Sequence, residues 1–147
     1  MSGEERLSAS VTVPGRIESV RPAASLLVAM ARQLNVPAAE NALFEVALVE
    51  ALGNALRHNA RDDDGPLRCD FDLIGRTLTI RVLDQGARAP VDLSIPTGAA
   101  PWSDATADAW ETIPETGYGL YVMRAIFPAI RSVTHDGHHG IELQLVF

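Results

Sequence analysis

Two segments near the start of the chain carry apolar residues every three to four positions, the spacing of an amphipathic helix. The first covers residues 17–34, and its apolar positions are Ile17, Val20, Ala24, Leu27, Ala31 and Leu34. Residues 35–37 interrupt this spacing, and Pro37 suits the first turn of a helix. We therefore expect a second helix from Pro37 to about His58.

Apolar and polar residues alternate in five other segments, as they do in half-buried strands. These segments are 7–13, 67–73, 78–82, 130–134 and 141–147. A tight turn at Gly75 and Arg76 predicts that the second and third strands form a hairpin with one buried face. A short helix over 120–127, ended by Pro128, precedes the last two strands.

The order of these elements is β-α-α-β-β-loop-α-β-β. Strands adjacent in sequence can pair as antiparallel hairpins, and helices can then cover one face of the sheet. We expect an α+β fold: a two-layer α/β sandwich whose mixed, mostly antiparallel sheet is covered on one face by helices. A doubly wound fold is disfavoured because strands and helices do not alternate regularly. The 147 residues fit a single domain, 1–147.

Charge limits the kinds of partner. The formal net charge is −7, which argues against a general nucleic-acid or anionic-membrane binder because phosphate-rich surfaces attract basic ones. The chain contains no lysine, so all 12 of its Lys and Arg residues are arginines. A Walker-type P-loop is disfavoured for this reason, since its chemistry places a lysine on the phosphates.

Cysteine content and hydrophobic length point to the cytoplasm. Cys69 is the only cysteine, so no disulfide can form within the chain, and its place on an apolar strand face suits a core residue. The first six residues lack the apolar core of a signal peptide. The longest apolar stretch, 23–31, is too short to span a bilayer.

Polar residues gather on one face of the second predicted helix. Glu50, Asn54, Arg57 and His58 follow one another at spacings of three and four. A carboxylate there can accept a proton from an attacking hydroxyl or water, and an amide oxygen can ligate Mg²⁺. Taken alone, Glu-x-x-x-Asn is more often an ordinary solvated helix face.

A second motif follows the strand 78–82. Asp84 can accept a hydrogen bond from an amino group such as that of adenine, and Gly86 would let the backbone approach a flat base. Because aspartate and glycine are common turn residues, an ordinary turn is the alternative.

A long loop and a pair of glycines come next. Periodicity disappears over 85–116, a loop that contains Trp102 and Trp110 and is long enough to be functional or disordered. Gly117 and Gly119 then open the helix that begins near Leu120. Exposed backbone N–H groups at a helix start favour an anion, so this is a candidate phosphate cradle; a flexible hinge is the alternative.

The order of these motifs resembles that of the GHKL (Bergerat-type) ATPases, a superfamily that includes gyrase, the mismatch-repair ATPase, the heat-shock chaperone ATPase and histidine kinases. The motifs are, in chain order, Glu50-x-x-x-Asn54, Asp84-x-Gly86 and Gly117-x-Gly119. The compact size, the first strand and helix, and the segment 50–58 look most like the anti-sigma-factor serine/threonine kinases.

This resemblance implies ATP and Mg²⁺ as ligands. Glu50 would be the general base, Asn54 would hold Mg²⁺, Asp84 would read adenine, and residues 85–116 would form a lid. The residues implied to contact the nucleotide are Asn54, His58, Asp84, Gly86, Gly117, Gly119 and Leu120. The implied partners are a small antagonist protein that is phosphorylated on serine or threonine, a sigma factor that is sequestered, or both, and a homodimer is compatible with the family.

Two departures leave other interpretations open. Arg88 stands where the family has a second glycine after Asp84, and Ile141 follows Gly140 where a threonine is common. A degenerate nucleotide-binding module that acts by sequestration is the alternative. A histidine-kinase fragment is disfavoured because neither a phosphoacceptor helix pair nor a membrane segment is evident.

A cluster near the end of the chain could suggest a metal site instead. It consists of His135, Asp136, His138 and His139. Because Gly137 and Gly140 flank these residues, a hairpin turn is the favoured interpretation.

Overall fold

The computed structural model describes residues 3–58, 65–84 and 119–147. Its five strands form one sheet in the order β1-β2-β3-β5-β4, and each neighbouring pair is antiparallel. The strands are β1 (Arg6–Val13), β2 (Leu67–Ile74), β3 (Thr77–Asp84), β4 (Ala129–His135) and β5 (His138–Val146). The expected α+β class is confirmed, with an antiparallel sheet among the described residues in place of a mixed one.

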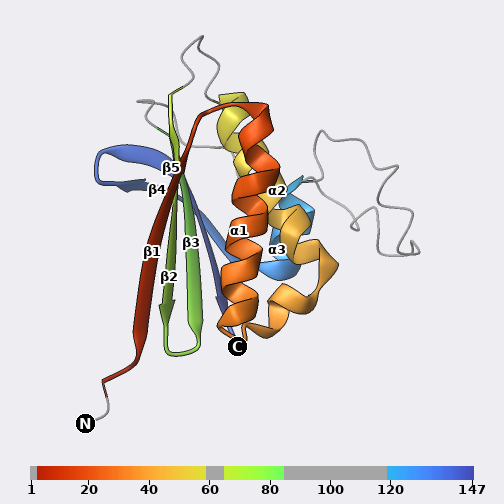
Figure 1. Cartoon of the computed structure of the whole chain (residues 1–147), viewed down its shortest axis with the longest axis vertical. Coiled ribbons are helices and arrows are strands. Elements are labelled where there is room, and N and C mark those ends of the chain that lie inside the picture. The colour runs from red at the N-terminus through yellow and green to blue at the C-terminus, as the bar shows by residue number, and fades with distance from the viewer. Residues whose placement is uncertain (1–2, 59–64, 85–118) are drawn as a thin grey trace.

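Three α-helices cover one face of this sheet, as Figure 1 shows. They are α1 (Val20–Gln33), α2 (Ala42–His58) and α3 (Gly119–Ile126). The described part of the chain is therefore the two-layer arrangement expected from the sequence. None of the helices in the described residues is long and apolar enough to cross a membrane.

Both long helices begin later than the apolar spacing predicts. Residues Ile17–Ser19 form a 3₁₀ turn, η1, before α1, and Pro37–Glu40 form a second one, η2, before α2. The cause at α2 is a local cap, because the Asn41 side-chain oxygen accepts a hydrogen bond from the Leu43 N–H at 2.9 Å. Helix α2 therefore starts after Asn41 and not at Pro37.

The core lies between the helices and the inner face of the sheet. Its largest fully buried side chains include Phe44, Leu48 and Leu52 of α2, which meet the apolar residues of β2, β3 and β5. The rings of Phe44 and Phe127 are 5.5 Å apart and tilted by 40°, which packs the end of α3 against α2. Helix α2 is thus held firmly along its apolar side.

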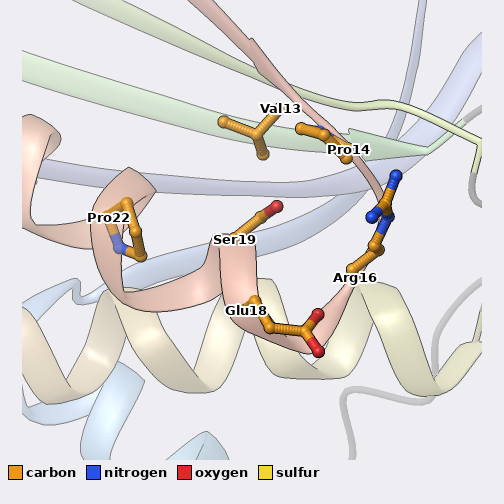
Figure 2. Close-up of a pocket in the computed structure, with 6 residues that line it drawn as sticks. All are labelled: Val13, Pro14, Arg16, Glu18, Ser19 and Pro22. Carbon is orange, nitrogen blue, oxygen red and sulfur yellow. The ribbon is translucent and has the colours of Figure 1, made fainter.

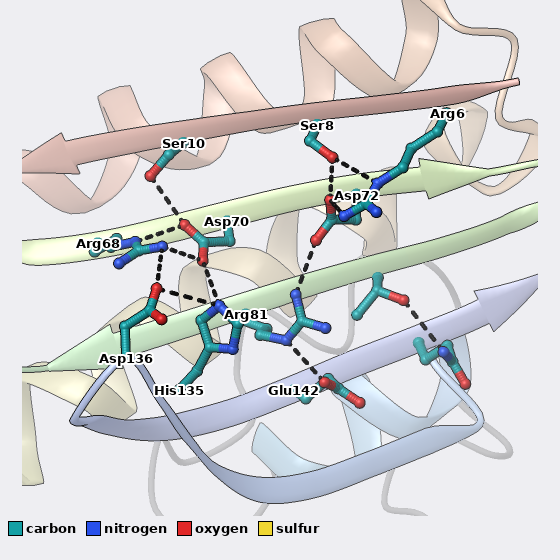
Figure 3. Close-up of polar contacts among 12 residues, drawn as sticks. Arg6, Ser8, Ser10, Arg68, Asp70, Asp72, Arg81, His135, Asp136 and Glu142 are labelled. Atoms are coloured by element: carbon teal, nitrogen blue, oxygen red, sulfur yellow. Dashed lines mark hydrogen bonds and ion pairs between the residues drawn. The ribbon is translucent and has the colours of Figure 1, made fainter.

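The outer face of the sheet, which no helix covers, carries a network of arginines and carboxylates (Figure 3). Arg81 reaches Asp72 at 2.8 Å and Glu142 at 2.9 Å, and Arg131 reaches Glu142 at 2.7 Å. Glu142 is only 4% exposed, so both of its oxygens are paired where water has little access. Paired charges replace an apolar surface on this face, which lets the sheet be solvated on one side.

The two hairpins turn as the sequence predicts. Gly75, between β2 and β3, has a positive φ of 57°. Asp136 and Gly137, between β4 and β5, have φ values of 52° and 80°, the backbone of a two-residue turn of type I′. The interpretation of the histidine cluster as a hairpin turn is therefore correct.

Candidate functional site

Helix α2 meets the first residue of α3 at Glu50 and Gly119. A β-carbon placed on Gly119 would lie 2.5 Å from Glu50 Oε2 and 3.4 Å from Glu50 Cδ. Only a glycine leaves room for the carboxylate at this position. Two predicted site residues that are far apart in sequence are thus brought into contact by the packing of α3 on α2.

Glu50, Asn54 and Arg57 form a polar cluster on the same face of α2, as the sequence predicts. Arg57 Nη2 donates a short hydrogen bond to Asn54 Oδ1 and lies 3.8 Å from Glu50 Oε2. The Glu50 side chain is 23% exposed and the Arg57 side chain 52% exposed. The cluster therefore opens to solvent and places a carboxylate, an amide oxygen and a guanidinium on one face over about two helical turns.

Asp84 is the last residue of β3 and is only 6% exposed. The β3–β5 register places His139 directly opposite it, and Ile141 opposite Val82. Asp84 falls on the same side of β3 as Ile80 and Val82, which face the core, because alternate residues of a strand share a face. The carboxylate therefore stands at the strand end on the helix side of the sheet.

Strand β5 approaches β3 unusually closely just before this point. A β-carbon on Gly140 would overlap the carbonyl oxygen of Val82 and lie 2.9 Å from Leu83 Cα. These are backbone atoms, which cannot turn aside as a side chain can. Gly140 is thus required for β5 to pass this part of β3, one residue from the pair that Asp84 makes with His139.

The remaining predicted site residues are placed only in part. Leu120 is half-buried and packs against the core, so it anchors the start of α3. His58 is the last residue of α2, but its side chain lies outside the described atoms. Outside the described residues also lie Gly86, Arg88, Trp102, Trp110, Gly117 and the whole predicted lid, 85–116.

Other candidate sites carry no catalytic chemistry. Cys69 is buried, and burial together with the nearby Asp70 raises its pKa to about 12, so it is a core thiol and not a nucleophile. No group of three or more metal-ligating side chains occurs in the described ranges. A shallow apolar hollow between β1 and α1 (Figure 2) contains none of the predicted site residues.

A comparison with protein families shows which fold family this arrangement belongs to. Residues 13–147 match the histidine kinase-like ATPase domain. The chain belongs to this family. No curated protein matches the sequence.

Membership in the histidine kinase-like ATPase family indicates which ligand the domain binds. The match covers both the α2 cluster and the end of β3, so the domain is an ATP-binding, kinase-like module. The Glu50–Gly119 contact and Asp84 then mark two places on the helix side of the sheet, both made by residues that the sequence analysis singled out.

Sequence reasoning overlooked three residues near this histidine kinase-like ATPase site. Arg57 was placed on the right face but given no task, although it bridges Asn54 and Glu50. His139 was assigned only to a turn, yet it lies opposite Asp84. The need for Gly140 was missed because the signal, the pairing of β3 with β5, arises from strand order and not from local sequence.

Proposed function

We propose that this protein is an ATP-dependent serine/threonine kinase of the anti-sigma-factor type. It would work in the cytoplasm and would phosphorylate a small antagonist protein, sequester a sigma factor, or do both. The observation that supports this best is the contact of the Glu50 carboxylate with Gly119 at the start of α3, one helical turn from Asn54. A base, a metal ligand and a helix start suited to anions are thereby grouped in one place.

Asp84 would bind the adenine end of ATP. Its carboxylate is nearly buried at the end of β3, where it can accept a hydrogen bond from the adenine amino group. A carboxylate discriminates between bases, because a base that presents an oxygen there would place two acceptors against each other. Asp84 therefore serves recognition, and the α2 cluster serves the phosphates.

The residues of the α2 cluster fit Mg²⁺. Oxygen ligands are those that Mg²⁺ prefers, and Asn54 Oδ1 already accepts a hydrogen bond from a cationic group, Arg57. The absent side chain of Gly119 leaves room for the Glu50 carboxylate, and the Glu50 side chain remains 23% exposed. When bound, the metal would neutralise phosphate charge, while Arg57 supplies a second positive charge to the same region.

Glu50 would act on the hydroxyl group of the substrate protein. The hydroxyl oxygen forms a bond to the γ-phosphorus, the bond from that phosphorus to the β–γ bridging oxygen breaks, and ADP leaves with the electron pair. Glu50 Oε2 takes the hydroxyl proton. Catalysis of this kind depends mainly on position and charge, so a displaced carboxylate would slow transfer without preventing ATP binding.

Calorimetric titration of Mg²⁺-ATP tests the binding half of this proposal. We expect the wild type to bind and Asp84→Asn to bind much more weakly, with Glu40→Gln, an exposed carboxylate on η2, as the matched control. A folded wild type that binds no ATP would contradict the proposal.

Phosphoryl transfer tests the catalytic half. The protein is incubated with γ-labelled ATP and a dialysed lysate of its source cells, and labelled phosphoserine or phosphothreonine proteins are identified. Wild type should label a small protein that Glu50→Gln does not. Equal labelling by the two proteins would remove Glu50 from the mechanism.

A second candidate function is a module that binds nucleotide without transferring phosphate and acts by sequestration. The observation that favours it is Ile141, which is 3% exposed and supplies an apolar surface diagonal to Asp84 where related sequences often have a hydroxyl. Stable capture of a protein partner, with no labelled product in the transfer assay, would favour this function.

A further inference from the structure

The tip of the β4–β5 hairpin reaches across the outer face of the sheet to β2. Strands β3 and β5 separate β4 from β2 in the sheet, so residues at this tip would be remote from β2 in a flat sheet. Asp136 Oδ2 nevertheless lies 3.1 Å from Arg68 Nη2. Figure 3 shows Asp136 directed toward Arg68, and Figure 1 shows the hairpin on the side opposite the helices.

Four side chains make this contact, which we call the clasp: Arg68, Asp70, His135 and Asp136. Arg68 holds Asp70 with two hydrogen bonds, 2.8 Å from Nε and 2.9 Å from Nη2. His135 Nε2 lies 3.4 Å from Asp136 Oδ2 and 3.8 Å from Asp70 Oδ2. Arg68 is thus oriented by a nearly buried carboxylate of its own strand, and it presents its remaining donor capacity to the hairpin tip.

Two further observations show that the hairpin bends at its base. Gly140 allows β5 to pass over the Val82 carbonyl, which a side chain would prevent. Leu83 faces the outer side with Arg68 and Gly140 as its register partners, and it is 1% exposed although it lies outside the core cluster under the helices. Burial of an apolar side chain on this face is what a hairpin lying over it would produce.

The clasp lies next to the end of β3. The last pair of the β3–β5 ladder is Asp84 with His139, and only His138 separates His139 from the turn. Thr134 Oγ1 and His139 Nδ1 are 2.9 Å apart, so β4 and β5 are tied together near the tip as well. Asp136 is therefore separated by very few residues from the Asp84–His139 pair. A displacement of Asp136 would consequently displace this pair as well.

We propose that Arg68 and Asp136 are positioning residues for the nucleotide site, and that their ion pair on the outer face sets the placement of Asp84 on the inner face. This inference rests on the proposed role of Asp84 in reading adenine. The pair holds the β5 end of the ladder against β3, and without it the terminal Asp84–His139 pair frays first, since strand ends are the least restrained part of a sheet.

Asp136→Asn is the sharpest variant for testing this. Asparagine tolerates the positive φ at this position and, with Gly137, gives the residue pair most typical of a type I′ turn, so the hairpin itself is preserved. Only the charge opposite Arg68 is lost. Arg6→Gln is the matched control, because it removes a guanidinium 3.6 Å from Asp72 on the same face but away from the hairpin tip.

The measurement is base discrimination, taken as the ratio of the calorimetric affinities for Mg²⁺-ATP and Mg²⁺-ITP. Inosine carries an oxygen where adenosine carries the amino group. In Asp136→Asn this ratio should fall by about fivefold, in the range typical of coupling between sites. Arg6→Gln should keep the wild-type ratio. Asp84→Asn provides the reference value, the affinity ratio expected when the carboxylate no longer recognises adenine.

The other outcomes separate this inference from the proposed function. An unchanged ratio in Asp136→Asn, with a wild type that binds ATP, overturns the clasp and leaves the proposed function standing. An equal loss of both affinities together with a lower melting temperature shows a purely structural role and also overturns it. A wild type that binds neither nucleotide contradicts the proposed function and, with it, the positioning role.

Discussion

The carboxylate of Glu50 occupies space that the side chain of any residue other than glycine at position 119 would claim, since a β-carbon there would lie 2.5 Å from Glu50 Oε2. The atom that would be displaced is the far end of a flexible side chain. A methyl group at position 119 can therefore be accommodated by rotating Glu50 away, at little cost to the fold. The position of the carboxylate is what such a change would alter.

Gly119→Ala should consequently separate catalysis from stability. We expect phosphoryl transfer to fall by about 10²-fold, as when a catalytic group is misplaced by an ångström, while the melting temperature stays close to that of wild type. Gly53→Ala is the matched control on α2, because its new β-carbon would meet Arg57 at an ordinary 3.6 Å. That control should be stabilised by about 0.5–1 kcal/mol. Normal transfer by Gly119→Ala would show that the Glu50 position does not matter.

Gly140→Ala should behave in the opposite way. Its β-carbon would overlap a backbone carbonyl oxygen, that of Val82, so strand β5 must move away from β3. We expect a loss of about 2–3 kcal/mol in the free energy of unfolding, measured by chemical denaturation. A variant as stable as wild type would mean that the two strands can separate here without cost.

Asp72 should make the outer face of the sheet sensitive to acid. Burial by itself raises its pKa, but hydrogen bonds from Ser8 and Arg81 and the charges of Arg81 and Arg6 outweigh this and hold the pKa below its usual value. A lowered native pKa gives stability that is present above the unfolded pKa of about 3.9 and is lost as the pH falls through the native value.

The measurement is the difference in unfolding free energy between wild type and Asp72→Asn as a function of pH. This difference should be largest near neutral pH. It should narrow below about pH 4, where the carboxylate of the unfolded chain takes up a proton first, and it should vanish at the lower pH at which the native carboxylate is protonated as well. Glu40→Gln serves as the control, since this carboxylate is exposed on η2. A difference for Asp72→Asn that does not depend on pH would contradict the assignment.

Cys69 should resist thiol reagents in the native protein. Burial raises its pKa to about 12, so at pH 8 almost no thiolate is present and no reagent can reach it. Dithionitrobenzoate should therefore react only as fast as the protein unfolds, and should titrate one thiol per chain in guanidinium chloride. Rapid native labelling would show that the β2 side of the core opens locally.

Local patterns predicted the elements of this fold well, because each depends on a few neighbouring residues. The alternation in 67–73 and the turn at Gly75 specified the β2–β3 hairpin, and the helical spacing before His58 specified α2. The start of α2 was placed wrongly because the Asn41 cap competes with continued apolar spacing. Strand order was out of reach, since the pairing of β3 with β5 is decided by tertiary packing.

The candidate site, like the fold, could be predicted from the sequence only in part. The shared face of Glu50, Asn54 and Arg57 follows from helical periodicity and could be read directly from the sequence. The contact of Glu50 with Gly119 depends on the packing of α3 on α2. The only sign of this packing in the sequence is the glycine itself. The ion pair of Arg68 with Asp136 in the clasp could not be predicted, because it depends on both the strand order and the bend at Gly140.

The paired charges of the outer sheet face also shape the electric field around the protein. Four arginines there meet four carboxylates: Arg6, Arg68, Arg81 and Arg131 with Asp70, Asp72, Asp136 and Glu142. Because these charges cancel, the formal −7 of the chain resides on the remaining residues. An anionic nucleotide thus diffuses toward an acidic molecule with one neutral side, and dissolved salt speeds the encounter by shortening the reach of that repulsion.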